Sequence, residues 1–198
     1  YVADHYARAL RRQQSNVVGV VIWDLTDDFF AEVFAGIETA LRQSSHMMMV
    51  VGANRDPDQL DVCFDKFRSI RADGVLLLDA VESELSSTGH KIAQHNVPAV
   101  LVGCRSEELS SVYVDNRIGG SDAMDYLIDL HHDELFYFGT AKRSASTADR
   151  LRGARESIAA TGMEPRFHLV ETAVTEEGGY EAFKTLLAKS SHGTKAIL

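Results

Sequence analysis

An aromatic pair near the start of this chain is well suited to hold a small molecule. Phe30 fits the apolar stripe of an expected helix, whereas Phe29 lies one position off that stripe and faces the end of the preceding strand. A ring in that place can stack on a flat ligand or cover the apolar face of a sugar. The alternative is that Phe29 simply packs beneath a loop.

Arg150 and Asp115 could supply the polar contacts of such a site. Ser146 and Asp149 form a capping-box-like helix start, so Arg150 falls within or just after the first turn, where a cation opposes the helix dipole. A ligand hydroxyl or carboxylate would offset that cost, although Arg150 could also be solvated or paired with Asp149. Asp115 follows a short strand and can cap the next helix, or it can accept a hydrogen bond from a ligand at the junction of two halves.

The sequence contains no motif for catalysis or for a cofactor. It has neither G-x-G-x-x-G nor G-x-x-x-x-G-K-[ST], and it lacks C-x-x-C, H-E-x-x-H and G-x-S-x-G. Its eight histidines are scattered without the spacing of metal ligands. Asp24, Asp27 and Asp28 could bind a cation, but capping of the following helix explains them better. We therefore expect no catalytic residue, no metal and no cofactor, which leaves a Rossmann-like enzyme as the least supported hypothesis.

Composition and charge limit the kinds of partner. The 198 residues are 45% apolar and 25% charged, and no apolar run reaches the roughly 18 residues that a membrane span needs. A net charge of −9 argues against binding DNA across a broad face of the body. Residues 1–14, in contrast, hold three arginines against one aspartate, which predicts a separate task for this segment. The two cysteines suit a reducing compartment.

Strand and helix patterns alternate along the remaining chain. The expected strands cover Val17–Trp23, Met47–Gly52, Gly74–Leu78, Ala99–Gly103, Val112–Val114, Leu135–Phe138, Phe167–Glu171 and Lys195–Leu198. Helical stripes separate most of them, and this alternation is typical of parallel sheets in the α/β class. We expect two Rossmann-like halves joined near Asp115, the second one incomplete. Open sheets of this kind bind ligands beyond the carboxyl ends of their strands.

Several segments resemble the LacI family of bacterial transcription regulators. The opening YVADHYARALRR is similar to the family's Y-x-P-N-x-x-A-R-x-L-R, and VVGVVIWDLTDDFFAEVFAGIETAL resembles its I-G-x-V-x-x-D-x-x-N-P-F-F-A-E-x-x-x-G-I-E. Later blocks are matched by ADGVLLL, VPAVLVGCR, VYVDNRIGG, RLRGARESIAATG and EEGGYEAFKTLL. Because these segments follow one another in the expected order, the resemblance covers essentially the whole chain.

The resemblance implies a hinge remnant at residues 1–15, an N-terminal effector-binding subdomain at 16–115 and a truncated C-terminal subdomain at 116–198. The fold would be of the type I periplasmic-binding-protein kind. A small-molecule effector, a sugar or another metabolite, would bind in the cleft between the subdomains. Operator DNA would be bound through a helix-turn-helix that this chain lacks and through the hinge. The protein would act as a homodimer in the cytoplasm, and no membrane would be among its partners.

The resemblance also assigns residues to these tasks. It places effector contacts at Phe29, Phe30, Arg105, Asp115 and Arg150. It places the DNA hinge at Arg8, Leu10 and Arg11, where an apolar wedge flanked by arginines can kink DNA. The main alternative is a periplasmic sugar-binding protein of a transport system, which would have the same architecture. The hinge pattern, the unpaired cysteines and the lack of a secretory signal pattern weigh against it.

Overall fold

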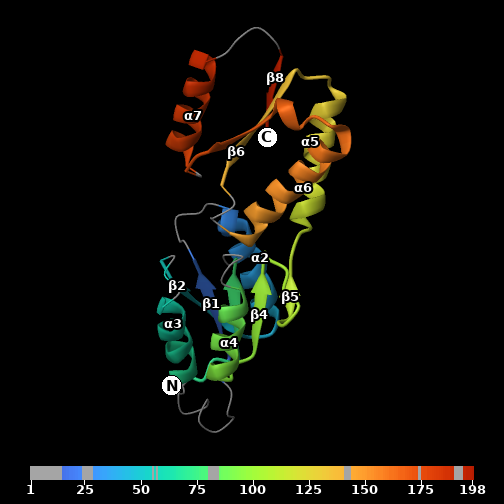
Figure 1. Cartoon of the computed structure of the whole chain (residues 1–198). Coiled ribbons are helices and arrows are strands. Elements are labelled where there is room, and N and C mark those ends of the chain that lie inside the picture. The colour runs from blue at the N-terminus through green and yellow to red at the C-terminus, as the bar shows by residue number, and fades with distance from the viewer. Residues whose placement is uncertain are drawn as a thin grey trace. The chain divides into compact units, whose positions relative to one another are not determined.

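The structure, a computed structural model of the chain, describes residues 15–23, 29–54, 56, 58–79, 85–140, 144–173, 175–189 and 194–198. The chain divides into two compact units, Tyr1–Tyr113 and Val114–Leu198 (Figure 1). The expected hinge residues Arg8, Leu10 and Arg11 lie outside the described residues, and so does the acidic cluster at 24–28. Within the described ranges, no helix has both the length and the apolar character that crossing a membrane requires.

The first unit, Tyr1–Tyr113, is built on one parallel sheet of five strands. In chain order these are β1 (Val17–Ile22), β2 (Met47–Gly52), β3 (Gly74–Leu78), β4 (Ala99–Val102) and β5 (Ser111–Val112). Their order across the sheet is β2-β1-β3-β4-β5, and every neighbouring pair is parallel. The run of β-branched residues in β1 fits this central place, because a central strand is covered on both faces.

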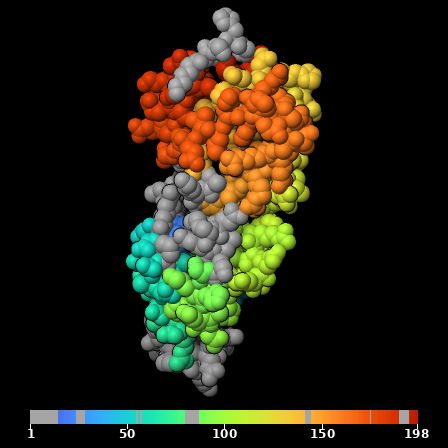
Figure 2. Space-filling view, in the orientation of Figure 1, coloured from blue at the N-terminus to red at the C-terminus, as the bar shows by residue number. Residues whose placement is uncertain are grey.

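Helices cover both faces of this sheet (Figure 1). On one face, Phe30 of α2 (Phe29–Gln43) packs into a core with Val20, Ile22 and Leu78. The opposite face lies against α3 (Asp58–Ser69) and α4 (Leu85–His95), which Figure 2 shows side by side in teal and green. Gly19 of β1 permits this close approach, because a Cβ at that position would lie 2.6 Å from the ring of Phe67 in α3.

The second unit, Val114–Leu198, repeats the same principle on a smaller scale. Its strands are β6 (Glu134–Gly139), β7 (Phe167–Glu171) and β8 (Lys195–Ile197), paired in parallel in the order β7-β6-β8. The helices are α5 (Asn116–Asp129), α6 (Ala145–Thr161) and α7 (Glu176–Lys189), with a short 3-10 turn at Glu164–Arg166. One sheet face packs against α5 and α6 through a core that contains Met124, Leu135, Tyr137, Leu151, Ala154, Ile158 and Ala196.

Both sheets therefore place their first strand between the second and the third. The chain reverses its direction of travel across the sheet at β1/β3 in the first unit and at β6/β8 in the second. In open α/β sheets, ligands bind beyond the carboxyl ends of the strands at this switch point. The α/β fold with two parallel sheets, expected from the sequence, is confirmed.

Two local expectations were wrong. The strand expected at Val112–Val114 is limited to β5 (Ser111–Val112), because Tyr113 and Val114 are exposed and have no strand partner among the described residues. The cap of α6 is Ser144, which forms a capping box with Thr147, so Arg150 lies in the second helical turn.

Candidate functional site

Phe29 and Phe30 begin α2, just beyond the carboxyl end of β1. Phe30 is only 6% exposed and belongs to the core, whereas Phe29 is 68% exposed. The two rings contact each other edge to face, with centroids 5.3 Å apart and planes at 79°. The buried ring therefore supports the exposed one, which offers an aromatic surface at the edge where a ligand is expected.

Arg105 lies beyond the carboxyl end of β4 in the same unit. Gly103 has a positive φ of 97° and donates its amide to the carbonyl of Val112 at 2.8 Å. A side chain would be strained in that conformation, so glycine suits this turn. After the turn, Cys104 is buried and Arg105 is exposed. The turn thus places a cation at the ligand edge of the sheet.

Two buried polar atoms near this edge were missed by sequence reasoning. Trp23 directly follows β1 and is 8% exposed, and its indole Nε1 has no hydrogen-bond partner among the described residues. The hydroxyl of Thr88, near the start of α4, is likewise buried and unpaired within the described ranges. An unsatisfied buried donor or acceptor costs about 1–3 kcal/mol. A tryptophan at a strand end was the signal that could have identified Trp23.

In the second unit, Asp115 caps α5. Its Oδ1 accepts a hydrogen bond from the amide of Ile118 at 3.0 Å, which confirms the capping interpretation of this residue. The side chain is exposed, and Arg117 lies close enough to feel its charge. One carboxylate oxygen of Asp115 thus serves the helix.

Arg150 lies on α6, close to the first turns of α5. The two helices approach so closely that a Cβ at Gly120 would overlap the carbonyl oxygen of Arg150, and a Cβ at Gly153 would overlap that of Arg117. The expected pairing of Arg150 with Asp149 is not the one observed, because Asp149 binds Arg152. Asp115 and Arg150 therefore belong to one packed pair of helices.

Tyr137 of β6 is a partner of Arg150 that the sequence did not reveal. Burial raises the pKa of the Tyr137 phenol, and Arg150 offsets part of this rise through its charge and a hydrogen bond. Tyr137 is 8% exposed and precedes Gly139, the last residue of β6. The interaction ties the guanidinium of Arg150 to the carboxyl-end half of this strand.

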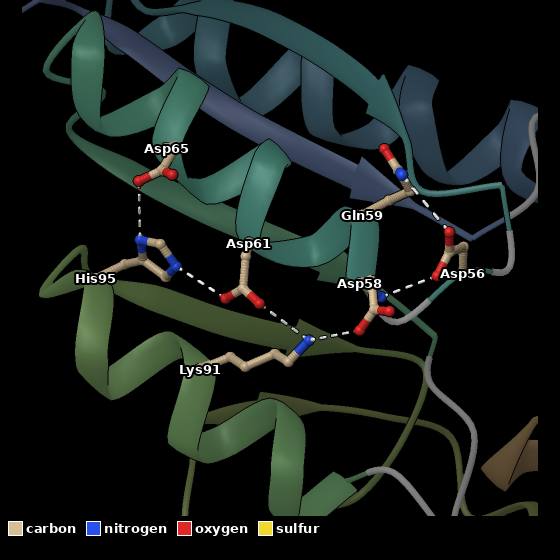
Figure 3. Close-up of polar contacts among 7 residues, drawn as sticks. All are labelled: Asp56, Asp58, Gln59, Asp61, Asp65, Lys91 and His95. Atoms are coloured by element: carbon tan, nitrogen blue, oxygen red, sulfur yellow. Dashed lines mark hydrogen bonds and ion pairs between the residues drawn. The ribbon is translucent and has the colours of Figure 1, made fainter.

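A cluster of charged residues joins α3 to α4 (Figure 3). His95 stacks on Phe64 and places Nε2 3.0 Å from Asp61 and Nδ1 3.5 Å from Asp65. Lys91 lies 3.0 Å from Asp61. The hydrogen bond from His95 lowers the pKa of the Asp61 carboxyl, burial opposes this shift, and Lys91 adds to it. Because its members pair across the two helices, the cluster is a structural link rather than a reactive site.

No metal site is formed in the part of the chain that the structure describes. There, His, Cys, Asp and Glu side chains nowhere gather in a group of three that could hold an ion. The two cysteines, Cys63 and Cys104, are buried and form no disulfide, and burial raises the pKa of the Cys63 thiol. The described residues thus offer an aromatic ring and an arginine in the first unit, and a carboxylate and an arginine in the second.

Comparison with known proteins gives consistent matches along the chain. The sequence profile described as periplasmic binding proteins and sugar binding domain of LacI family matches residues 15–197. The maltose regulon regulatory protein MalI of Escherichia coli is 26% identical over 193 residues, which are 94% of this chain and 55% of that protein. The sucrose operon repressor of Klebsiella pneumoniae is 23% identical and covers 100% of this chain and 59% of its own length.

Solved structures share the fold. The Lac repressor dimer bound to operator and the anti-inducer ONPF has a TM-score of 0.84 at 17% identity, over 100% of this chain and 69% of that one. The complex of the transcriptional regulator CelR with cellobiose has a TM-score of 0.73 at 22% identity, over 92% of this chain and 60% of that one. The chain spans little more than half the length of the two curated relatives, 55% and 59%.

Proposed function

Because the chain belongs to the family of periplasmic binding proteins and LacI-type sugar-binding domains, we propose that it is the effector-sensing part of a LacI-type transcriptional regulator. The observation that carries this proposal is the match with proteins named as regulators, which extends over both units. Because these relatives are named as regulators, the matches favour a regulator over a sugar-transport protein and over an enzyme. In this role the protein would act on DNA in the cytoplasm.

The proposed effector is a sugar or a related small metabolite, bound by Phe29, Phe30, Arg105, Asp115 and Arg150. The exposed ring of Phe29 suits the apolar face of a sugar, and an arginine fork suits its hydroxyls or a carboxylate. Phe30 would act by supporting Phe29, since it is buried in the core. The expectation that the ligand binds between the two halves stays a prediction.

Binding of operator DNA is assigned to the segment that carries Arg8, Leu10 and Arg11. Its basic character contrasts with the acidic remainder of the chain, and leucine beside arginine is a chemistry that enters minor grooves.

We also infer that the protein forms a homodimer through the edge strand β2. This strand contains no charged residue, and Met47, Met49 and Val50 are exposed along it. Uncharged edge strands are usually covered, and the similar Lac repressor structure is a dimer. In sedimentation velocity, Met49→Glu should lower the dimer fraction, while Val112→Glu on the opposite edge strand should not. Equal dimer fractions in the two variants would refute this interface.

The effector site is tested by calorimetry with a panel of mono- and disaccharides and nucleosides. A binder should raise the unfolding temperature, since ligand at 100 times its Kd adds about 2.7 kcal/mol of stability. Arg150→Ala should then weaken binding by about 10- to 100-fold, the usual loss for a hydrogen bond to a charged group. Arg152→Ala, on the same helix but paired with Asp149, is the control and should leave Kd unchanged. Equal affinity of the Arg150 variant and the parent would remove Arg150 from the site.

A further inference from the structure

Asp73 holds the point at which the N-terminal segment enters the first unit. It directly precedes β3, at the amino end of the sheet, opposite the edge that carries Phe29 and Arg105. Its Oδ1 accepts a hydrogen bond from the amide of Ser15 at 3.2 Å, and its Oδ2 accepts one from the amide of Asn16 at 2.8 Å. Both carboxylate oxygens are therefore engaged where the expected hinge remnant, ending at Ser15, joins the first unit at Asn16.

Further hydrogen bonds fix the same short stretch. Asn16 has a left-handed backbone with φ of 52°, and its carbonyl accepts from the amide of Met47 at 2.8 Å. The carbonyl of Val17 accepts from the amide of Asp73 at 2.8 Å, and the hydroxyl of Ser15 accepts from the amide of Val17 at 3.2 Å. Ser15 is only 7% exposed. The backbone turn at Ser15–Val17 is thus tied to both β2 and β3.

His46 is a third partner of the Asp73 carboxylate. Its Nε2 lies 3.4 Å from Oδ2 of Asp73, and its Nδ1 lies 2.9 Å from the hydroxyl of Ser44. The carboxylate, which directly precedes β3, therefore has partners on the turn before β2 and on the entry to β1. Bonds to an ionised acceptor are stronger than neutral ones, so the orientation of this turn is well defined.

We propose that Asp73 is a positioning residue that fixes the direction in which the N-terminal segment leaves the first unit. The inference rests on the proposed function, because it assigns a role within DNA binding. A segment that is fixed at one end loses less conformational entropy when it binds DNA, and its affinity for DNA is therefore higher.

The chain provides a matched control in its second unit. Asp133 directly precedes β6, and its Oδ2 accepts from the amide and the hydroxyl of Thr194 at 2.8 and 3.0 Å. Thr194 directly precedes β8, so this carboxylate also joins the amino ends of a first and a third strand. Asp133→Asn therefore removes the negative charge from the same kind of contact without touching Ser15 or Asn16.

The experiment compares Asp73→Asn and Asp133→Asn in the intact regulator, including its DNA-reading part. Asparagine keeps the size of aspartate but has one acceptor oxygen, so one amide bond at Ser15 or Asn16 is lost. In Asp73→Asn, amide hydrogen exchange should rise about tenfold at the residue, Ser15 or Asn16, that loses its bond, and operator affinity should fall by a similar factor. The Kd for the effector should not change. Asp133→Asn should leave both the exchange at Ser15 and the operator affinity as in the parent.

Each other result has a definite meaning. If Asp73→Asn binds operator as tightly as Asp133→Asn does, the positioning role is wrong, although the regulator itself stands. Unchanged exchange at Ser15 and Asn16 would refute the anchor directly. If the parent protein binds no DNA at all, the proposed function fails and the inference fails with it.

Discussion

Phe29 and Phe30 are adjacent in α2 but have different environments, one suited to ligand binding and the other to core packing. Phe30 points into the core with Val20 and Leu78, and Phe29 stays at the surface against its edge. Helical periodicity was sufficient to predict this difference, because the core stripe of α2 includes the second ring and excludes the first. The interpretation of Phe29 as buried beneath a loop does not agree with its exposure.

Substitution of each ring tests this division. Phe30→Ala should lower the free energy of unfolding by about 3–5 kcal/mol, because it empties a packed core position. Phe29→Ala should change it by no more than about 0.5 kcal/mol. The same variant should raise the effector Kd by about 3- to 10-fold, the value of one aromatic contact. Chemical denaturation and calorimetry give the two quantities. A large loss of stability in Phe29→Ala would show that its ring is structural.

Other residues of the candidate site could not have been found from local pattern. Tyr137 meets Arg150 because α6 packs across β6, and Trp23 is buried at the end of β1, an interior strand of its sheet. Such contacts join residues from separate elements, and periodicity carries no information about them. Asp115, by contrast, was predictable as a cap because capping depends on the nearest turn alone.

At the scale of elements, the crossing of α5 and α6 depends on two glycines. Gly120 and Gly153 each face backbone of the partner helix, where a methyl group would overlap a carbonyl oxygen. The hydroxyls of Ser121 and Ser157 meet 2.8 Å apart beside them. Small residues thus let the helix that carries Arg150 lie against the helix that Asp115 caps.

Alanine substitution at neighbouring glycines tests this crossing. Gly120→Ala should lower the free energy of unfolding by about 1–3 kcal/mol, as overpacking usually does. Gly119→Ala, in the same helix with nothing within 4 Å of the added methyl, should raise it by up to about 1 kcal/mol. Urea denaturation measures both variants. Equal effects of the same sign would contradict the close crossing.

The link between α3 and α4 predicts a dependence of stability on pH. Because the folded-state pKa of Asp61 is lowered, its stabilisation is complete above the unfolded-state pKa and disappears as pH falls through the folded-state value. The difference in unfolding free energy between the parent and Asp61→Asn should therefore shrink from about pH 6 to about pH 3. Asp125→Asn, an exposed aspartate on α5, is the control. A difference that stays constant with pH would exclude the His95–Asp61 contact as its source.

The strands β2, β3 and β7 have the bounds that the sequence predicted, since each is a compact apolar or β-branched run between turn residues. The errors fell where the pattern is weak. β5 is two residues long and is fixed only by pairing with β4. The start of α6 was placed late because Ser144 and Ser146 offer similar capping chemistry, and only the geometry selects Ser144.

At the scale of the whole molecule, two parallel sheets, each with its first strand between its second and its third, carry candidate ligand residues after their strands. Phe29 and Arg105 follow strands of the first unit, and Arg150 is tied to a strand of the second. The family match covers both units together. We therefore propose that this chain senses an effector and thereby controls DNA binding.

The most direct test is a titration of operator DNA, obtained by selection in vitro, with the intact regulator in the presence and absence of the effector found by calorimetry. Coupling between the two sites predicts that the effector changes operator affinity by about 5- to 150-fold. Fluorescence anisotropy of labelled operator measures this change. An effector that binds the protein and leaves operator affinity unaltered would contradict the account.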